Sequence, residues 1–198
     1  MILDIEGWGS IYMRKIILFG DSITAGYYDG EMTLKLNDQI QRYFPDVEVI
    51  NAGIPGDTTR RALARVQQHV IKYHPDVVTV FFGANDAADG SGIDEHEYRE
   101  NLQTIIQDIG ANKIVLVGPP LVRRIQHEDD RPFRRLNEYN GIAKELAILN
   151  QIPFVDLFSQ MQEQINLDNL WQADGLHFSN QGYLLLGRLL ASELRKRS

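Results

Sequence analysis

A hydroxyl, an imidazole and a carboxylate are the side chains of this sequence whose types and spacing could do chemistry together. Ser22 lies in the run Gly20-Asp21-Ser22-Ile23-Thr24-Ala25-Gly26, directly after the apolar residues 16–19. Asp174 and His177 stand three residues apart, far downstream, in Asp174-Gly175-Leu176-His177. A serine hydroxyl becomes a good nucleophile when an imidazole takes its proton and a carboxylate orients that imidazole. Brought together, these side chains would form an acyl-transfer site.

Strands and helices that alternate along the chain must position these side chains. Short apolar runs predict strands, and apolar residues at helical spacing predict helices. The strands are expected at residues 16–19, 47–50, 77–82, 114–117 and 153–156, and the helices at 36–44, 63–70, 98–109, 136–147 and 183–194. Such alternation implies a parallel sheet covered on both faces. We therefore expect an α/β fold, a three-layer α/β/α sandwich with a five-stranded, mostly parallel sheet of flavodoxin-like topology and strand 77–82 at its centre.

The loops that follow the strands carry the remaining polar residues. In an open parallel sheet, ligands bind beyond the carboxyl ends of the strands, so these loops would share one edge. They are Gly20-Asp21-Ser22, residues 51–58, Gly83-Ala84-Asn85-Asp86 and Gly118-Pro119-Pro120, and Asp174 to His177 precede the last helix. Each loop alone is also typical of an ordinary turn or helix cap. Their joint occurrence in this order favours a shared site.

These segments resemble the sequence blocks of the SGNH (GDSL-type) hydrolase family. Gly20-Asp21-Ser22 resembles the first block, although Ile23 stands where the family name has leucine. Gly56 matches the second block, Gly83-Ala84-Asn85-Asp86 the third, and Asp174-x-x-His177 the fifth. The matched blocks run from residue 20 to residue 183, and Gly118-Pro119-Pro120 leans toward members that resemble isoamyl acetate-hydrolysing esterases. The resemblance implies a serine esterase or acylhydrolase that uses no metal and no organic cofactor.

The resemblance also implies a role for each matched residue. Ser22 would be the nucleophile that forms an acyl-enzyme, His177 the base and then the acid, and Asp174 the group that orients the imidazole. The backbone N–H groups of Ser22 and Gly56 and the side-chain amide of Asn85 would form the oxyanion hole. The Gly-x-Ser-x-Gly elbow of α/β-hydrolases is absent, because position 24 is threonine.

The substrate is less well defined by the sequence. The acyl pocket is expected to be lined by the side chains near the catalytic edge, namely Ile54, Ala87, Pro120, Leu121 and Leu176, with Tyr27 and Tyr28 beside them. Their modest size favours short acyl chains, whereas the resemblance allows simple esters, thioesters, lysophospholipids or acetylated sugars. The arginine-rich stretch 121–135 is interpreted as a solvated helix start, with a lid as the alternative. His127 and its acidic neighbours are interpreted as a solvated turn rather than a metal site, because no second histidine lies at ligand spacing.

Composition limits the classes of function. The chain has 198 residues, 43% of them hydrophobic, and a net charge of −7, so we expect one domain (13–198) and no nucleic-acid partner. Residues 1–12 are interpreted as an N-terminal extension, because Met13 directly precedes the first strand. The absence of cysteine, of a signal peptide and of a long apolar run predicts a cytoplasmic protein without a membrane span. The alternative function is a non-catalytic small-molecule-binding module on a flavodoxin-like scaffold.

Overall fold

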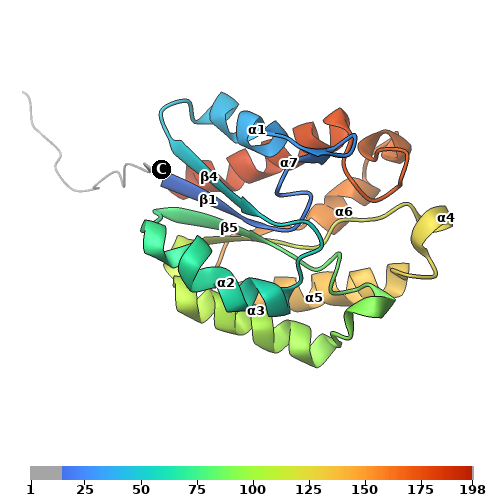
Figure 1. Cartoon of the computed structure of the whole chain (residues 1–198), viewed down its shortest axis with the longest axis horizontal. Helices are drawn as coiled ribbons and strands as arrows, with labels where there is room; N and C mark the ends of the chain where they lie inside the picture. The colour runs from blue at the N-terminus through green and yellow to red at the C-terminus, as the bar shows by residue number, and fades with distance from the viewer. Residues whose placement is uncertain (1–14, 198) are drawn as a thin grey trace, which may run out of the picture.

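A parallel sheet forms the centre of the molecule. The computed structural model describes residues 15–197, so the expected extension 1–12 lies outside the described residues. The strands of the sheet are β1 (Lys15–Gly20), β4 (Glu48–Gly53), β5 (Val77–Phe81), β6 (Ile114–Val117) and β7 (Phe154–Val155). They run in the order β4-β1-β5-β6-β7, and every neighbouring pair is parallel (Figure 1). This is the predicted flavodoxin-like order, with the most apolar strand in the middle.

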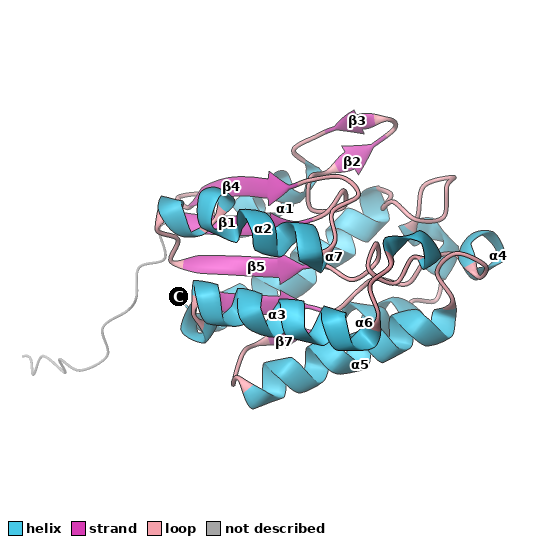
Figure 2. Cartoon of the chain, turned by 60° about the horizontal axis from the view of Figure 1, so that its bottom comes forward, coloured by secondary structure: helices cyan, strands magenta, loops and turns pink. Residues whose placement is uncertain are grey.

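Helices cover both faces of the sheet, as predicted. They are α1 (Lys35–Tyr43), α2 (Thr59–His69), α3 (Glu95–Ile109), α4 (Arg124–His127), α5 (Phe133–Leu149), α6 (Leu157–Gln162) and α7 (Asn180–Leu194). Short 3₁₀ turns add η1 (Ile71–Tyr73), η2 (Asp89–Ser91), η3 (Ala111–Lys113), η4 (Leu167–Leu170) and η5 (Arg195–Arg197). Helices α1 and α7 lie on one face, and α2, α3 and α5 lie on the other (Figures 1 and 2). Both faces of the inner strands β1, β5 and β6 are therefore buried, which explains why their sequences are mainly apolar, whereas the edge strand β4 is only half-buried.

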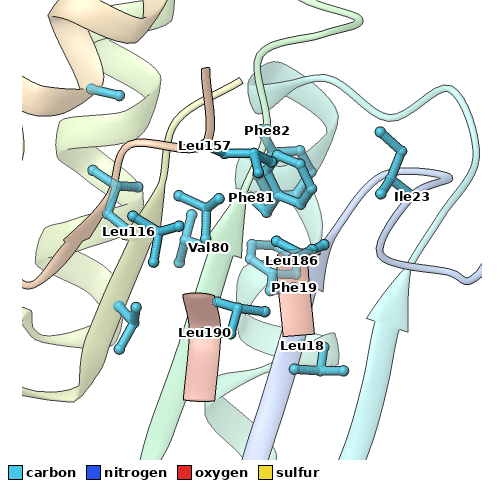
Figure 3. Packing of buried hydrophobic residues seen from close by; sticks show 14 of the residues in the cluster. Leu18, Phe19, Ile23, Val80, Phe81, Phe82, Leu116, Leu157, Leu186 and Leu190 are labelled. Carbon is cyan, nitrogen blue, oxygen red and sulfur yellow. The ribbon is translucent and has the colours of Figure 1, made fainter. Parts of the chain in front are cut away.

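One hydrophobic core joins the layers. Figure 3 shows Phe19 and Val80 of the sheet in this core together with Leu186 and Leu190 of α7, and each of these side chains is at most 1% exposed. Helix α7 begins at Asn180, three residues before the expected range 183–194, because the Ser179 hydroxyl accepts hydrogen bonds from the backbone N–H groups of the first turn. Burial of this apolar surface fixes the strand ends from which the polar loops emerge.

Several short elements differ from the prediction. A two-stranded hairpin, β2 (Tyr27–Tyr28) with β3 (Glu31–Met32), follows the Ser22 turn, and α6 lies in a stretch where we expected no helix. The short helix α4 lies within the stretch 121–135, which we interpreted as a helix start. Elements of two to six residues are too short to show a hydrophobic period, so the sequence gives no signal for them. No helix between residues 15 and 197 combines the length and the hydropathy needed to cross a bilayer.

Candidate active site

The turn after β1 presents Ser22 at the carboxyl edge of the sheet. The side chain of Asp21 accepts a hydrogen bond from the Ile23 N–H (2.9 Å), and the Ser22 carbonyl accepts one from the Tyr27 N–H (3.0 Å). Gly20 makes this turn possible, because a Cβ at this position would lie 2.6 Å from the Phe81 carbonyl oxygen. Ser22 itself is 8% exposed, so it lies in a largely buried turn.

The structure brings Ser22, His177 and Asp174 together. His177 Nε2 lies 3.0 Å from Ser22 Oγ, and His177 Nδ1 lies 2.7 Å from Asp174 Oδ2. An ionised carboxylate only accepts hydrogen bonds, so this geometry assigns the proton of the neutral ring to Nδ1 and leaves Nε2 free to accept from the serine hydroxyl. The arrangement can therefore move a proton from Ser22 to His177.

A tight turn holds the Asp174 carboxylate against the imidazole. Its Oδ1 accepts from the backbone N–H groups of Leu176 (2.9 Å) and His177 (3.0 Å). Partial burial acts to raise the pKa of Asp174, but the hydrogen bonds from the His177 side chain and from these N–H groups outweigh it, and the pKa lies below its ordinary value. Asp174 is consequently an anion across the neutral pH range.

The loops after β4 and β5 lie beside the Ser22 turn. The Ile54 N–H donates to the Gly20 carbonyl (3.0 Å), which ties the loop after β4 to the end of β1. Gly56 in that loop is exposed and has φ = +71°, a conformation that favours glycine. The half-buried Asn85 amide donates to the Asp57 carbonyl (3.0 Å) and lies 3.4 Å from the Asp21 carboxylate. The loops that bear Ser22, Gly56 and Asn85 are thus connected by hydrogen bonds.

Beneath these loops lies a layer of buried carboxylates that we did not predict. Asp21, Asp57 and Asp86 are each at most 2% exposed, and each is the sequence neighbour of a candidate oxyanion donor. Burial raises the pKa of Asp21 to about 7, with further contributions from the nearby carboxylates, and burial raises the pKa of Asp86 to about 6. Asp86 Oδ1 accepts from the backbone N–H of Thr59 (2.8 Å) and also from its hydroxyl.

Asp57 is neutralised by arginines of α2. Its carboxylate pairs with Arg65 Nε (2.6 Å) and with Arg61 Nε (3.0 Å). Arg65 also donates to the carbonyls of Gly20 (3.0 Å) and Ala52 (2.8 Å), so it connects the ends of β1 and β4. The four-residue spacing of Asp57, Arg61 and Arg65 is a sequence signal that could have identified this network.

The expected acyl-pocket residues divide into two groups. Ile54 and Leu176 are half-buried near the site, and the Tyr27 ring contacts the His177 ring with centroids 4.3 Å apart. Pro120 and Leu121 are buried, and Leu121 lines an apolar cavity of about 530 Å³ shared with Val122, Arg123, Arg124, Ile125, Phe133, Gln162, Leu167, Asp168 and Trp171. Ala87 has no exposed surface, so the expectation that it lines the pocket is wrong.

The interpretation of residues 121–135 as a solvated stretch is also wrong for its central residues. The His127 side chain is only 17% exposed, and its Nε2 lies 2.8 Å from the Asp174 carbonyl oxygen. Arg131 is 14% exposed and donates from Nε to the Ala84 carbonyl (3.0 Å). Within residues 15–197 no three His, Asp or Glu side chains are grouped so that they could hold a metal ion.

A parallel three-layer sandwich with serine, histidine and aspartate side chains at the carboxyl edge of its sheet is typical of an ester hydrolase. Residues 18–185 match the GDSL-like lipase/acylhydrolase family, and the chain belongs to this family. The match confirms the resemblance to the SGNH (GDSL-type) hydrolases.

Individual relatives agree with this assignment. The crystal structure of a lipase/acylhydrolase from Enterococcus faecalis is 43% identical, with a TM-score of 0.90 over 93% of this chain and 97% of that chain. A GDSL esterase/lipase of Arabidopsis thaliana is 32% identical over 92% of this chain and 86% of its own length. The isoamyl acetate-hydrolyzing esterase of Saccharomyces cerevisiae is 29% identical over 86% of this chain and 81% of its own length. The relatives are thus esterases and acylhydrolases, which supports ester hydrolysis.

Proposed function

We propose that the protein is a serine esterase that cleaves carboxylic esters through an acyl-enzyme on Ser22. The observation that carries this proposal is the contact chain Ser22 Oγ to His177 Nε2 (3.0 Å) and His177 Nδ1 to Asp174 Oδ2 (2.7 Å). These distances already meet the requirement that a base be within hydrogen-bond reach of the proton it removes.

The reaction follows from these contacts. His177 Nε2 takes the hydroxyl proton as Ser22 Oγ bonds to the ester carbonyl carbon. The resulting imidazolium gives that proton to the leaving alkoxide when the ester bond breaks, and the acyl group stays on Ser22. Water then loses a proton to His177 and attacks the acyl carbon, which releases the carboxylic acid and restores the serine. Asp174 stabilises the imidazolium in both halves.

The oxyanion would be held by the N–H groups of Ser22 and Gly56 and by the Asn85 amide. Glycine at position 56 supports this role, because nothing lies within 4 Å of the place where its Cβ would be and a substrate oxygen can approach the backbone closely. The Asn85 amide supports it as well, because its contacts with the Asp57 carbonyl (3.0 Å) and the Asp21 carboxylate (3.4 Å) anchor the side chain beside Ser22. Such donors act without adding charge to the resting site.

We further propose that the acyl group is short. Ile54 and Leu176 are half-buried apolar side chains in the loops at this edge, and the Tyr27 ring contacts the His177 ring. A relative at 29% identity is named for the hydrolysis of isoamyl acetate, which is an ester of a two-carbon acid. A chain-length series of nitrophenyl esters, measured beside acetylated sugars, should give the highest kcat/KM for the acetyl or butyryl ester. A maximum at long chains would contradict a short acyl pocket.

The nucleophile is tested with a fluorophosphonate probe. We expect one covalent adduct, located at Ser22 by peptide mass spectrometry, and no adduct in Ser22→Ala. Ser192→Ala, which removes an exposed serine of α7, is the matched control and should label normally. Labelling at another residue, or a folded protein that neither labels nor hydrolyses any ester, would refute the proposal and favour the binding-module alternative.

A further inference from the structure

The short helix α4 lies against the loop that bears Asp174 and His177. Three consecutive carbonyl groups of this loop accept hydrogen bonds from the segment 123–127. The bonds run from Gln126 Nε2 to the Ala173 carbonyl (2.9 Å), from His127 Nε2 to the Asp174 carbonyl (2.8 Å), and from the Arg123 N–H to the Gly175 carbonyl (2.7 Å). One short segment therefore holds the outer side of the whole turn.

The contact between α4 and this loop is tightly packed at Gly175. Gly175 has φ = +70°, and a Cβ there would lie 2.2 Å from Gln126 Oε1 and 2.8 Å from Arg123 Cβ. A residue with a side chain would push α4 away from the loop. The absence of a side chain at Gly175 thus permits the backbone hydrogen bonds to α4.

His127 contacts this loop and also a residue outside it. Its Nδ1 lies 3.0 Å from Asp130 Oδ1, and its Nε2 faces the Asp174 carbonyl. Carbonyl and carboxylate oxygens only accept, so both contacts are hydrogen bonds at once when each ring nitrogen carries a proton. In that form His127 connects the backbone of Asp174 to the carboxylate of Asp130.

Asp130 extends the connection to the loop after β5. Its carboxylate pairs with Arg131, and Arg131 Nε donates to the Ala84 carbonyl (3.0 Å), directly before Asn85. The Asp130 carbonyl in addition accepts from the Asp89 N–H (2.9 Å). The chain of contacts therefore runs from the loop with the candidate base to the loop with the candidate oxyanion amide, without passing through the sheet.

We propose that His127 is a positioning residue, which holds the loop of Asp174 and His177 at a fixed distance from the loop of Asn85. The inference rests on the proposed function, since its purpose is to keep the imidazole within reach of Ser22. Small displacements of a base that must meet its partner at 3.0 Å are costly in rate, whereas substrate binding depends on them much less. The predicted effect is therefore on kcat rather than on KM.

Three substitutions at His127 separate this role from a general structural one. The amide nitrogen of glutamine can reach the position of Nε2, and that of asparagine the position of Nδ1. We expect His127→Ala to lower kcat by about 10- to 100-fold with little change in KM, and His127→Asn and His127→Gln, which each keep only one of the two contacts, to show smaller losses. His96→Ala is the matched control, because this exposed histidine of α3 lies 3.5 Å from Glu100 and belongs to another surface. Equal losses in all three His127 variants, or none, would overturn the inference.

A second measurement does not depend on catalysis. Amide hydrogen exchange of the peptide 172–178 should be faster in His127→Ala than in the unaltered protein and unchanged in His96→Ala. If the unaltered protein neither labels nor hydrolyses esters, the proposed function fails, and the exchange experiment still decides whether His127 holds the loop. Unchanged exchange in His127→Ala would overturn the inference even in an active esterase.

Discussion

The two sides of the candidate site are held in place by different means. On the nucleophile side, Ser22 follows β1 and is 8% exposed, above the buried side chains of Asp21 and Asp57. On the base side, Asp174 lies in a surface loop with 43% of its side chain exposed. Its position depends on the turn that its own carboxylate closes and on the hydrogen bonds from α4. The core fixes one side, and surface hydrogen bonds fix the other.

This difference separates stability from chemistry. A substitution on the nucleophile side disturbs groups that are packed between strands and helices, so it should change the free energy of unfolding as well as the reaction. A substitution on the base side disturbs a loop that hydrogen bonds at the surface hold in place, so it should change the reaction more than the free energy of unfolding. Substitutions on each of the two sides therefore test this contrast.

The largest effect is expected on the base side. His177→Ala should lower kcat by about 10⁴- to 10⁶-fold, because Ser22 is left without a proton acceptor. Its melting temperature should stay close to that of the unaltered protein. The double variant Ser22→Ala/His177→Ala should be no slower than either single variant, since the two groups act as one unit. The test is a nitrophenyl acetate assay together with thermal unfolding; losses that multiply in the double variant would show that the two side chains act independently.

A smaller effect on rate, joined by an effect on stability, is expected for the nucleophile side. Asn85→Ala should lower kcat by about 100- to 1,000-fold through loss of one oxyanion donor. It should also lower the free energy of unfolding by about 1 kcal/mol, because the Asp57 carbonyl loses its partner at 3.0 Å. Steady-state kinetics and urea unfolding measure the two effects. Asn180→Ala, at an exposed asparagine of α7, is the control, and a normal kcat in Asn85→Ala would remove Asn85 from the oxyanion hole.

The sequence predicted the fold because the fold depends on long apolar patterns. Apolar runs predicted the strands, and α3 ends at Ile109, where the range 98–109 was expected to end. The expectation that Ala87 lines the pocket was wrong, because closeness to Asn85 in the sequence does not fix the direction in which the Ala87 side chain points. The turn after β5 closes with a hydrogen bond from the Ala87 N–H to the Gly83 carbonyl (2.9 Å), and Ala87 lies in the core.

The polar supports of the site were harder to predict for a physical reason. Serine, histidine and aspartate have a recognisable spacing, whereas His127 bonds a backbone carbonyl 47 residues away. Every residue has a carbonyl, so such a partner leaves no trace in the sequence. Asp21 and Asp86 were visible as residues, but their burial, and therefore their raised pKa values, depends on how three loops pack together.

The smallest effect concerns Asp21 and the pH dependence of stability. Burial raises its pKa from an ordinary 3.8 to about 7, so the folded protein binds this proton more tightly than the unfolded chain does. The associated stability is complete below about pH 4 and is lost as the pH rises through about 7. Asp21→Asn keeps a neutral side chain at every pH and retains an oxygen for the Ile23 N–H. The free energy of unfolding of Asp21→Asn, compared with that of the unaltered protein, should therefore increase by about 1–3 kcal/mol as the pH rises from 5 to 8.

Urea unfolding at a series of pH values measures this difference, with Asp38→Asn on the exposed face of α1 as the control that should show none. Asp86 also carries a raised pKa and lies near Asp21, so part of the pH dependence should remain in the variant. A constant difference between the two proteins from pH 5 to pH 8 would mean that Asp21 does not change its charge in this range. The charge state of Asp21 would then contribute nothing to the pH dependence of stability on the nucleophile side, and packing and hydrogen bonds alone would distinguish it from the base side.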